Sequence, residues 1–169
     1  MGRDKAALRV EGEPLAHRVA RELARACGRV TVLGREPLPG YGFLLDVEEY
    51  AGPKSALAAF QPEADLVFVA ACDMPLFRAE VVAGLRSLIG YRLAVVPMVD
   101  GKLQPLCALY ALAAWKELPA VQSASMMAWL DRLDVRVVTE LELESVGIDP
   151  RWIKGCNSQA ELAQLLADD

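Results

Sequence analysis

The chain has 169 residues, of which 54% are hydrophobic and 24% charged, and its formal net charge is −5. A chain with this much apolar sequence can bury a hydrophobic core, which excludes disorder. Its length predicts a single domain over residues 1–169. The acidic balance, without clusters of Lys and Arg among aromatic residues, argues against nucleic acid as a partner. No apolar run reaches the roughly 20 residues of a membrane span, and the N-terminus lacks a signal-peptide core. We therefore expect a cytoplasmic protein with no membrane partner.

Apolar runs of strand length alternate with segments of helical period, which predicts βα units around a mostly parallel sheet. The first expected helix begins at Leu15 after Pro14 and ends near Gly28. Strands are expected at residues 30–33, 42–45, 66–71, 93–96, 106–109 and 135–138. Further helices are expected at residues 78–88, 111–118, 125–133 and 158–167. The run over 66–71 is continuously apolar, which is typical of a strand covered on both faces.

The four cysteines are scattered, and the chain has one histidine, so no zinc ligand set is expected. Each cysteine is expected to be reduced and buried. These residues are Cys27, Cys72, Cys107 and Cys156.

Asp73 follows the 66–71 strand directly, so its carboxylate is expected at the carboxyl edge of the sheet, where open α/β folds bind ligands. A carboxylate there can hold Mg²⁺ against nucleotide phosphates. The alternative is that an Asp before Met-Pro only forms a turn. Asp46 also ends an apolar run, so two carboxylates would converge on one edge, with a turn-forming Asp46 as the equal alternative.

Residues 1–5, Met-Gly-Arg-Asp-Lys, look like the second half of a phosphate-binding loop whose first half is absent. Lys5 follows Gly2 closely and precedes a helix, so it can place a point charge on a phosphate. Taken alone, Lys5 is more simply a surface lysine.

Two further positions carry weaker signals. Gly52 opens a helix-like stretch whose first N–H groups can receive an anion, although a plain loop-to-helix junction explains it equally well. Gln104 follows an Asp100-Gly101 turn and could orient a polar ligand, although a hairpin alone would explain the turn.

Together these residues resemble the molybdenum cofactor guanylyltransferase family, also called molybdopterin-guanine dinucleotide biosynthesis protein A. Residues 1–5 match the tail of the family's phosphate loop, while its N-terminal strand and glycine pair are missing. The other matches follow in the family's order, at residues 12–15 (Gly-Glu-Pro-Leu), Asp46, residues 52–53 (Gly-Pro), residues 72–75 (Cys-Asp-Met-Pro), residues 104–110 and residues 157–162.

The resemblance implies a three-layer Rossmann-like nucleotidyltransferase fold, a mostly parallel sheet with helices on both faces and the first strand absent. It implies transfer of GMP from GTP to molybdopterin with Mg²⁺, release of pyrophosphate, and molybdoenzyme chaperones as further partners. By the same resemblance Lys5 and Asp73 are catalytic, and Gly2, Lys5, Asp46 and Asp73 bind the nucleotide. Asp73 would also hold the metal, and the weaker candidates for the pterin side are Gly52, Gln104 and Asn157.

Departures from the family pattern keep alternatives open. Leu33-Gly34 stands where some family members carry an asparagine that contacts nucleotide, so cytidylyl transfer, or nucleotidyl transfer to a sugar phosphate, competes with guanylyl transfer. Because the glycine loop is missing, a catalytically impaired cofactor-binding protein is a further alternative. Met1 is expected to be an internal methionine of the family motif. We expect the sheet to show an empty central position or another segment filling it, and this chain to bind GTP poorly.

Overall fold

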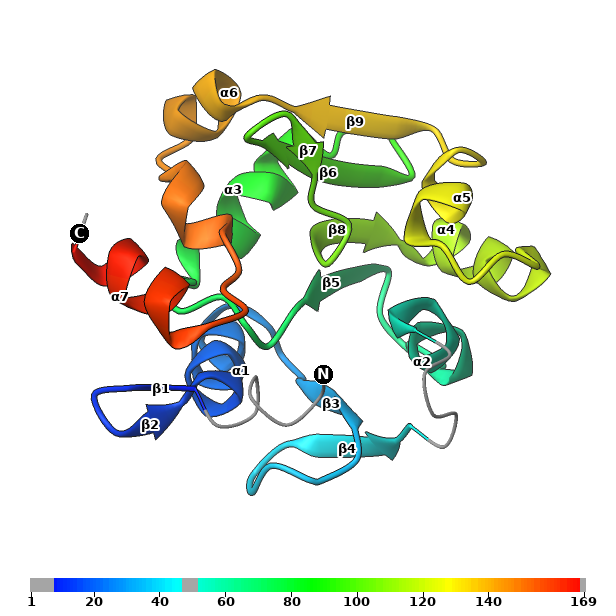
Figure 1. Cartoon of the computed structure of the whole chain (residues 1–169). Helices are drawn as coiled ribbons and strands as arrows, with labels where there is room; N and C mark the ends of the chain where they lie inside the picture. The colour runs from blue at the N-terminus through cyan, green and yellow to red at the C-terminus, as the bar shows by residue number, and fades with distance from the viewer. Residues whose placement is uncertain (1–7, 47–51, 168–169) are drawn as a thin grey trace.

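The computed structural model describes residues 8–46 and 52–167, which form a layered arrangement of strands and helices (Figure 1). The strands are β1 (Arg9–Val10), β2 (Glu13–Pro14), β3 (Thr31–Gly34), β4 (Gly42–Leu45), β5 (Leu66–Ala70), β6 (Ala94–Val99), β7 (Lys102–Leu103), β8 (Cys107–Ala111) and β9 (Val135–Val138). The α-helices are α1 (Leu15–Ala26), α2 (Pro53–Ala59), α3 (Glu80–Leu88), α4 (Leu112–Glu117), α5 (Met126–Leu130), α6 (Glu140–Ser145) and α7 (Gln159–Ala167). Two 3₁₀ turns, η2 (Leu118–Ala120) and η3 (Pro150–Ile153), complete the described chain. None of these helices is long and apolar enough to cross a membrane.

The largest sheet has five strands, in which β8 lies between β5 and β6 and pairs antiparallel with both. β9 pairs parallel with β6, and β7 pairs antiparallel with the last two residues of β6, Met98 and Val99. Asp100 and Gly101 both have positive φ, 50° and 68°, and reverse the chain between β6 and β7 as the sequence predicted. The α/β class is therefore confirmed, and the sheet is mixed because the chain returns through β8 between two strands of one direction.

Two smaller sheets lie apart from the five strands. β3 and β4 form a parallel pair below β5 in Figure 1, and β1 and β2 form a short hairpin beside α1. Among the described residues no strand lies between β3 and β5. The described residues therefore place no strand at the central position, and residues 1–7 lie outside the described part of the chain.

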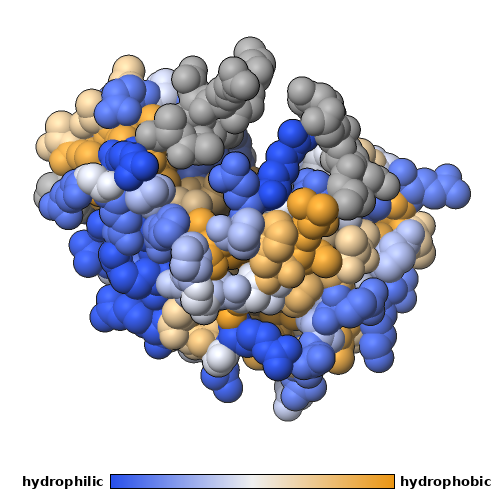
Figure 2. Space-filling model, turned by 90° about the horizontal axis from the view of Figure 1, so that it is seen from below, coloured by the Kyte–Doolittle hydropathy of each residue, from blue (hydrophilic) through white to orange (hydrophobic). Residues whose placement is uncertain are grey.

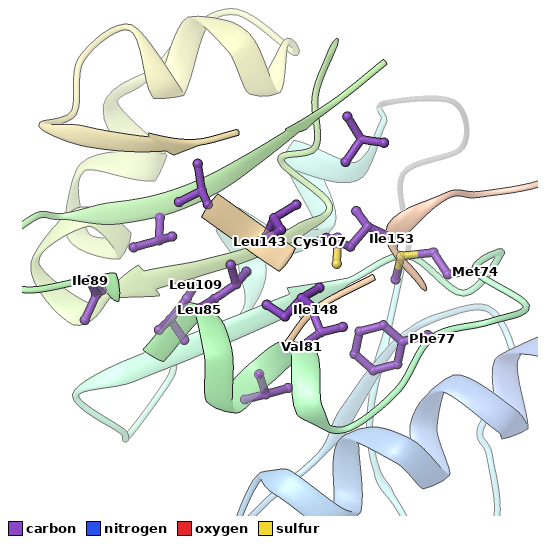
Figure 3. Packing of buried hydrophobic residues seen from close by; sticks show 14 of the residues in the cluster. Met74, Phe77, Val81, Leu85, Ile89, Cys107, Leu109, Leu143, Ile148 and Ile153 are labelled. Atoms are coloured by element: carbon purple, nitrogen blue, oxygen red, sulfur yellow. The ribbon is translucent and has the colours of Figure 1, made fainter. Parts of the chain in front are cut away.

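Side chains of the central strands alternate between two hydrophobic clusters, one on each face of the sheet. Val95 and Leu109 pack with α3 and η3 on one face, in the cluster that Figure 3 shows around Phe77, Val81, Leu85 and Ile148. Ala94, Val96, Ala108 and Tyr110 pack on the other face with α4 and α5, where Tyr110 stacks on Trp129 at 4.5 Å between ring centroids. The three-layer arrangement expected from the resemblance is thus present.

Candidate active site

A cavity of about 520 Å³ lies between β3 and β5, with α1 and α2 on its sides. Asp46, Gly52 and Asp73 all line this cavity. Two of them follow strands, Asp46 after β4 and Asp73 after β5. The structure therefore brings together the two carboxylates that the sequence placed at strand ends.

In the sequence, Asp73 lies between one exposed residue and a run of buried apolar residues. Cys72 before it is exposed, whereas Met74, Leu76 and Phe77 after it are 2%, 4% and 1% exposed. These apolar side chains fix the loop to the core, and Asp73 itself is half-buried. The turn that was the alternative interpretation of Asp73 is present, and it also presents Asp73 to the cavity.

A segment far along the chain supports the Asp73 loop. The N–H of Cys156 donates a hydrogen bond of 2.8 Å to the carbonyl oxygen of Asp73. A Cβ at Gly155 would lie 3.1 Å from Oδ1 of Asp73, so a side chain there would press on the carboxylate. Sequence reasoning missed this support, because Gly155 lies in an irregular segment that carries no periodic pattern.

Asp46 is placed by the ladder between β3 and β4. Its N–H donates to the carbonyl oxygen of Gly34 at 2.8 Å, and its half-buried side chain lines the large cavity. It also lines a smaller pocket of about 80 Å³ beside Ser55 and Ala56 of α2. Asp46 thus faces the start of α2.

Gly52 is the N-cap of α2 and has φ 83°, a conformation that favours glycine. Two residues on, the Lys54 side chain is buried and donates to the carbonyl oxygen of Val121. Lys54 therefore ties α2 to η2 and does not line the cavity.

Of the remaining predicted site residues that the structure describes, Gln104 and Asn157 do not line the cavity. Gln104 donates from Nε2 to the carbonyl oxygen of Lys102 at 3.3 Å, and its N–H donates to Pro97. Asn157 is exposed and follows Cys156, so its backbone comes near the Asp73 loop. Gly2 and Lys5 lie outside the described residues.

The cysteines do not all behave as expected. Cys107 and Cys156 are buried and Cys27 is half-buried, and burial raises the pKa of the Cys27 and Cys107 thiols. Cys72, by contrast, is exposed and lines the cavity beside Asp73, because it precedes the run that is anchored in the core. The expectation that Cys72 is buried is wrong.

The donor set fits a magnesium ion held together with a substrate. No group of three or more His, Cys, Asp or Glu gathers within residues 8–46 and 52–167. Mg²⁺ is commonly bound by one or two carboxylates, with waters and phosphate oxygens as its other ligands. Asp73 and Asp46, both on the wall of one cavity, match that pattern.

Comparison with known proteins places this site in a family. The MobA-like NTP transferase domain matches residues 1–137. The chain belongs to this family. The nucleotidyltransferase predicted from the sequence is thereby confirmed at the level of the family.

Relatives named "probable molybdenum cofactor guanylyltransferase" cover much of the chain. The protein from Nostoc is 30% identical over 96% of this chain and 83% of its own length. The protein from Bacillus licheniformis is 31% identical over 72% of this chain, a match that spans 65% of the relative. The resemblance to this group is therefore confirmed.

Solved structures show the same fold. The molybdopterin-guanine dinucleotide biosynthesis protein A of Archaeoglobus fulgidus superposes with a TM-score of 0.77 at 21% identity, over 97% of this chain and 89% of that one. A Mycobacterium tuberculosis protein solved in complex with manganese gives a TM-score of 0.65 at 16% identity, over 99% and 95% of the two chains.

Proposed function

We propose that this chain transfers GMP from GTP to molybdopterin, forming the guanine dinucleotide cofactor and releasing pyrophosphate. The observation that carries the proposal is the convergence of Asp46, Gly52 and Asp73 on one cavity in a MobA-like NTP transferase fold. The names of the relatives support the choice of substrates. Molybdoenzyme chaperones would receive the product.

The proposed reaction requires the protein mainly to align the two substrates and to neutralise the charge of their phosphates. An oxygen of the molybdopterin phosphate attacks the α-phosphorus of GTP, and the bond from that phosphorus to the bridging oxygen breaks as pyrophosphate leaves. Such transfers depend on alignment and neutralisation of charge, so no nucleophilic side chain is needed. Asp73, fixed by its buried neighbours and by Cys156, is positioned on the cavity wall, where it would hold the metal ion beside the reacting phosphates.

Asp73 and Asp46 are the residues that would hold Mg²⁺. When bound, the ion neutralises phosphate charge during the transfer. Asp46 would in addition contact the nucleotide beside the start of α2, and Lys5 and Gly2 would contact its phosphates. Gly52, Gln104 and Asn157 are the proposed contacts on the pterin side.

The test is release of pyrophosphate by the purified chain with GTP, Mg²⁺ and molybdopterin. Asp73→Asn should lower turnover about 100-fold or more, because a misplaced or uncharged ligand loses the alignment on which the step depends. Asp65→Asn is the matched control, since Asp65 is an exposed acid at the opposite end of β5. Turnover undiminished in Asp73→Asn would remove Asp73 from the mechanism.

Comparing GTP with CTP and ATP tests the donor base. A clear preference for CTP would replace guanylyl by cytidylyl transfer, and activity with a sugar phosphate in place of molybdopterin would change the acceptor.

The open cavity between β3 and β5 favours a second candidate, a chain that binds the cofactor without turning it over. Under this hypothesis GTP with Mg²⁺ binds this chain poorly and binds tightly to a version extended at its N-terminus. Titration calorimetry on both versions decides between the two candidates, because equal affinities would show that the phosphate loop is dispensable.

A further inference from the structure

The turn between β7 and β8 lies beside the loop that carries Asp73. The N–H of Ala71 donates a hydrogen bond of 2.6 Å to the carbonyl oxygen of Leu106, and both residues line the cavity together with Asp73. Gln104, a proposed contact on the pterin side, precedes Leu106 by two residues. The conformation of this turn therefore sets the position of one part of the cavity wall and of Gln104.

The turn covers residues 104–107. The N–H of Cys107 donates to the carbonyl oxygen of Gln104 at 3.0 Å, and Pro105 takes the second position, where β-turns favour proline. The hydrogen bond that closes such a turn leaves the carbonyl of the second residue without a partner inside the turn. Pro105 is half-buried, so its carbonyl oxygen needs a donor from elsewhere in the chain.

Tyr110 of β8 supplies that donor. Its hydroxyl donates a hydrogen bond of 2.8 Å to the carbonyl oxygen of Pro105. Tyr110 is completely buried, and its ring stacks on Trp129 and meets Trp115 edge-on, at 6.4 Å between ring centroids. Because two tryptophans hold the ring, the phenol oxygen has a fixed position against the turn.

Burial also fixes the hydrogen-bonding role of this hydroxyl. Removal from water, and to a smaller extent the neighbouring Cys107, raise the pKa of the Tyr110 phenol far above its ordinary value of 10. The hydroxyl therefore keeps its proton at neutral pH and well above it, and it acts as a donor. The indole N–H groups of Trp115 and Trp129 donate to carbonyl groups of other segments. Of the three rings, Tyr110 is thus the one that connects the aromatic cluster to the turn.

The carbonyl oxygens of residues 104, 105 and 106 all accept hydrogen bonds. They accept, in chain order, from the N–H of Cys107, the hydroxyl of Tyr110 and the N–H of Ala71. Two of the three donors are backbone groups, which any amino acid other than proline provides at those positions. The hydroxyl of Tyr110 is the donor that depends on the identity of a side chain.

The cavity offers few polar side chains that could orient a pterin. Most of its lining residues are apolar, and its carboxylates, Asp46 and Asp73, are proposed to hold the metal ion. The surface seen from below in Figure 2, on the side of β3 and β4, likewise mixes apolar groups with charged ones. Polar contacts with the ring must therefore come largely from residues beside the cavity.

Gln104 has the chemistry for such a contact. A pterin ring carries amide-like N–H and C=O groups, and a primary amide can donate to one and accept from the other. In the structure Nε2 of Gln104 donates to the carbonyl oxygen of Lys102 at 3.3 Å, which is long for an N–H···O hydrogen bond. A bound ring can replace this weak bond, provided that the turn holds Gln104 in reach.

We propose that Tyr110 is a positioning residue for the acceptor substrate: its hydroxyl holds the turn at residues 104–107, and the turn holds the Gln104 amide where it meets the pterin ring. This inference rests on the proposed function, in which Gln104 belongs to the pterin side. Tyr110 is completely buried and does not line the cavity, so it acts through the turn and touches neither substrate.

Hydrogen exchange in Tyr110→Phe tests the turn without any substrate. Phenylalanine keeps the ring between the two tryptophans and removes only the hydroxyl, so the variant should fold. Exchange of the Ala71 and Cys107 amides, which donate into the turn, should become about tenfold faster. The amide of Leu112, which donates to Asp65 at the other end of the β5–β8 pair, is the internal control and should not change. Unchanged exchange at the turn, or equal acceleration at all three amides, would overturn the proposal.

Steady-state kinetics test the consequence for the acceptor. Tyr110→Phe should raise KM for molybdopterin about fivefold or more while kcat and KM for GTP stay within about twofold, because a displaced Gln104 weakens the binding of one substrate. Ser87→Ala is the matched control, since it removes another bond from a hydroxyl to a carbonyl, at 2.7 Å to Gly84 within α3, and should leave all three constants unchanged. An unchanged KM for molybdopterin in Tyr110→Phe, or a fall in kcat alone, would refute the positioning role.

A double variant tests the route through Gln104. Gln104→Ala should raise KM for molybdopterin, and the addition of Tyr110→Phe should raise it no further, because both changes remove the same contact. Effects that multiply would show that the hydroxyl acts by another route and would overturn the proposal. A wild-type chain that releases no pyrophosphate would contradict the proposed function, whereas the exchange measurement would still test the turn. An active wild type with an unchanged KM in Tyr110→Phe would refute the positioning role alone.

Discussion

The N–H of Cys156 donates a hydrogen bond of 2.8 Å to the carbonyl oxygen of Asp73. Cys156 is completely buried in a small cluster with Leu8, Leu15 and Leu162. The cluster joins the N-terminal hairpin, α1 and α7 behind the loop that carries Asp73. The C-terminal helix is therefore part of the support of the candidate site, although none of its residues lines the cavity.

Gly155→Ala should impair activity while sparing the fold. The new Cβ would lie 3.1 Å from Oδ1 and 3.5 Å from Cγ of Asp73, so the carboxylate must move by a few tenths of an ångström or turn away. We expect turnover to fall about 10- to 100-fold, since small displacements of an aligned group are costly. Steady-state pyrophosphate release and a thermal melt measure the two effects separately.

Gly28→Ala is the control for this substitution, because a Cβ at Gly28 meets no atom within 4 Å. It should change neither turnover nor melting temperature appreciably. Wild-type turnover in Gly155→Ala would show that the approach of Gly155 to Asp73 has no bearing on the reaction.

Much of the fold follows from local patterns. The strands predicted at residues 42–45 and 135–138 have those bounds in the structure, and β5 ends one residue early. α6 was missed although Thr139 and Glu142 form a capping box there. Its apolar residues explain the omission, because Leu143 is buried but Leu141 is 78% exposed, so no apolar stripe marks the helix.

What local patterns cannot supply is the pairing of distant segments. The antiparallel position of β8 between β5 and β6 depends on contacts between segments that are distant in the sequence. The residues of β8 alone do not indicate which strands β8 pairs with. The same limit applies to the site. Asp46 and Asp73 were predicted because both follow strands, whereas Gly155 contacts Asp73 from an irregular segment after η3 that carries no periodic signal.

Asp46 and Asp73 should affect different kinetic constants. Asp46 lies beside the start of α2 and is proposed to bind nucleotide, so Asp46→Asn should raise KM for GTP about tenfold with a smaller change in kcat. Asp73→Asn should act mainly on kcat. Initial rates over a range of GTP concentrations separate the two. A fall in kcat alone for Asp46→Asn would assign Asp46 to the chemical step instead.

Gly84→Ala should destabilise the chain through one contact. A Cβ on this buried residue of α3 would lie 2.5 Å from Cδ1 of Ile148. Overpacking of this kind costs about 1–3 kcal/mol, offset in part by the higher helix propensity of alanine, about 1 kcal/mol. Urea denaturation should therefore show a net loss of up to about 2 kcal/mol.

Ile148→Val tests the same contact by removing Cδ1. Alone it should cost about 0.5–1.5 kcal/mol, but combined with Gly84→Ala the total should be smaller than the sum of the two single losses. Strictly additive losses would mean that Ile148 is not the group displaced by the methyl group added at position 84.

Low pH should lower the free energy of unfolding partly through Asp149, the N-cap residue of η3. Hydrogen bonds from the side chain of Arg151, at 2.9 Å from Nε, hold the pKa of the Asp149 carboxyl below its ordinary value of 3.8. A carboxyl whose pKa is lower in the folded state stabilises that state fully above its unfolded pKa, and the benefit disappears as the pH falls through the folded pKa.

Asp149→Asn keeps a side-chain oxygen that can accept from the N–H of Arg151, but it cannot titrate. We therefore expect its free energy of unfolding, measured in urea from about pH 7 down to about pH 3, to fall less steeply below about pH 4 than in the wild type. Asp131→Asn, at the exposed end of α5, should keep the wild-type slope, and a wild-type slope in Asp149→Asn as well would show that the Arg151 pair contributes nothing to acid sensitivity.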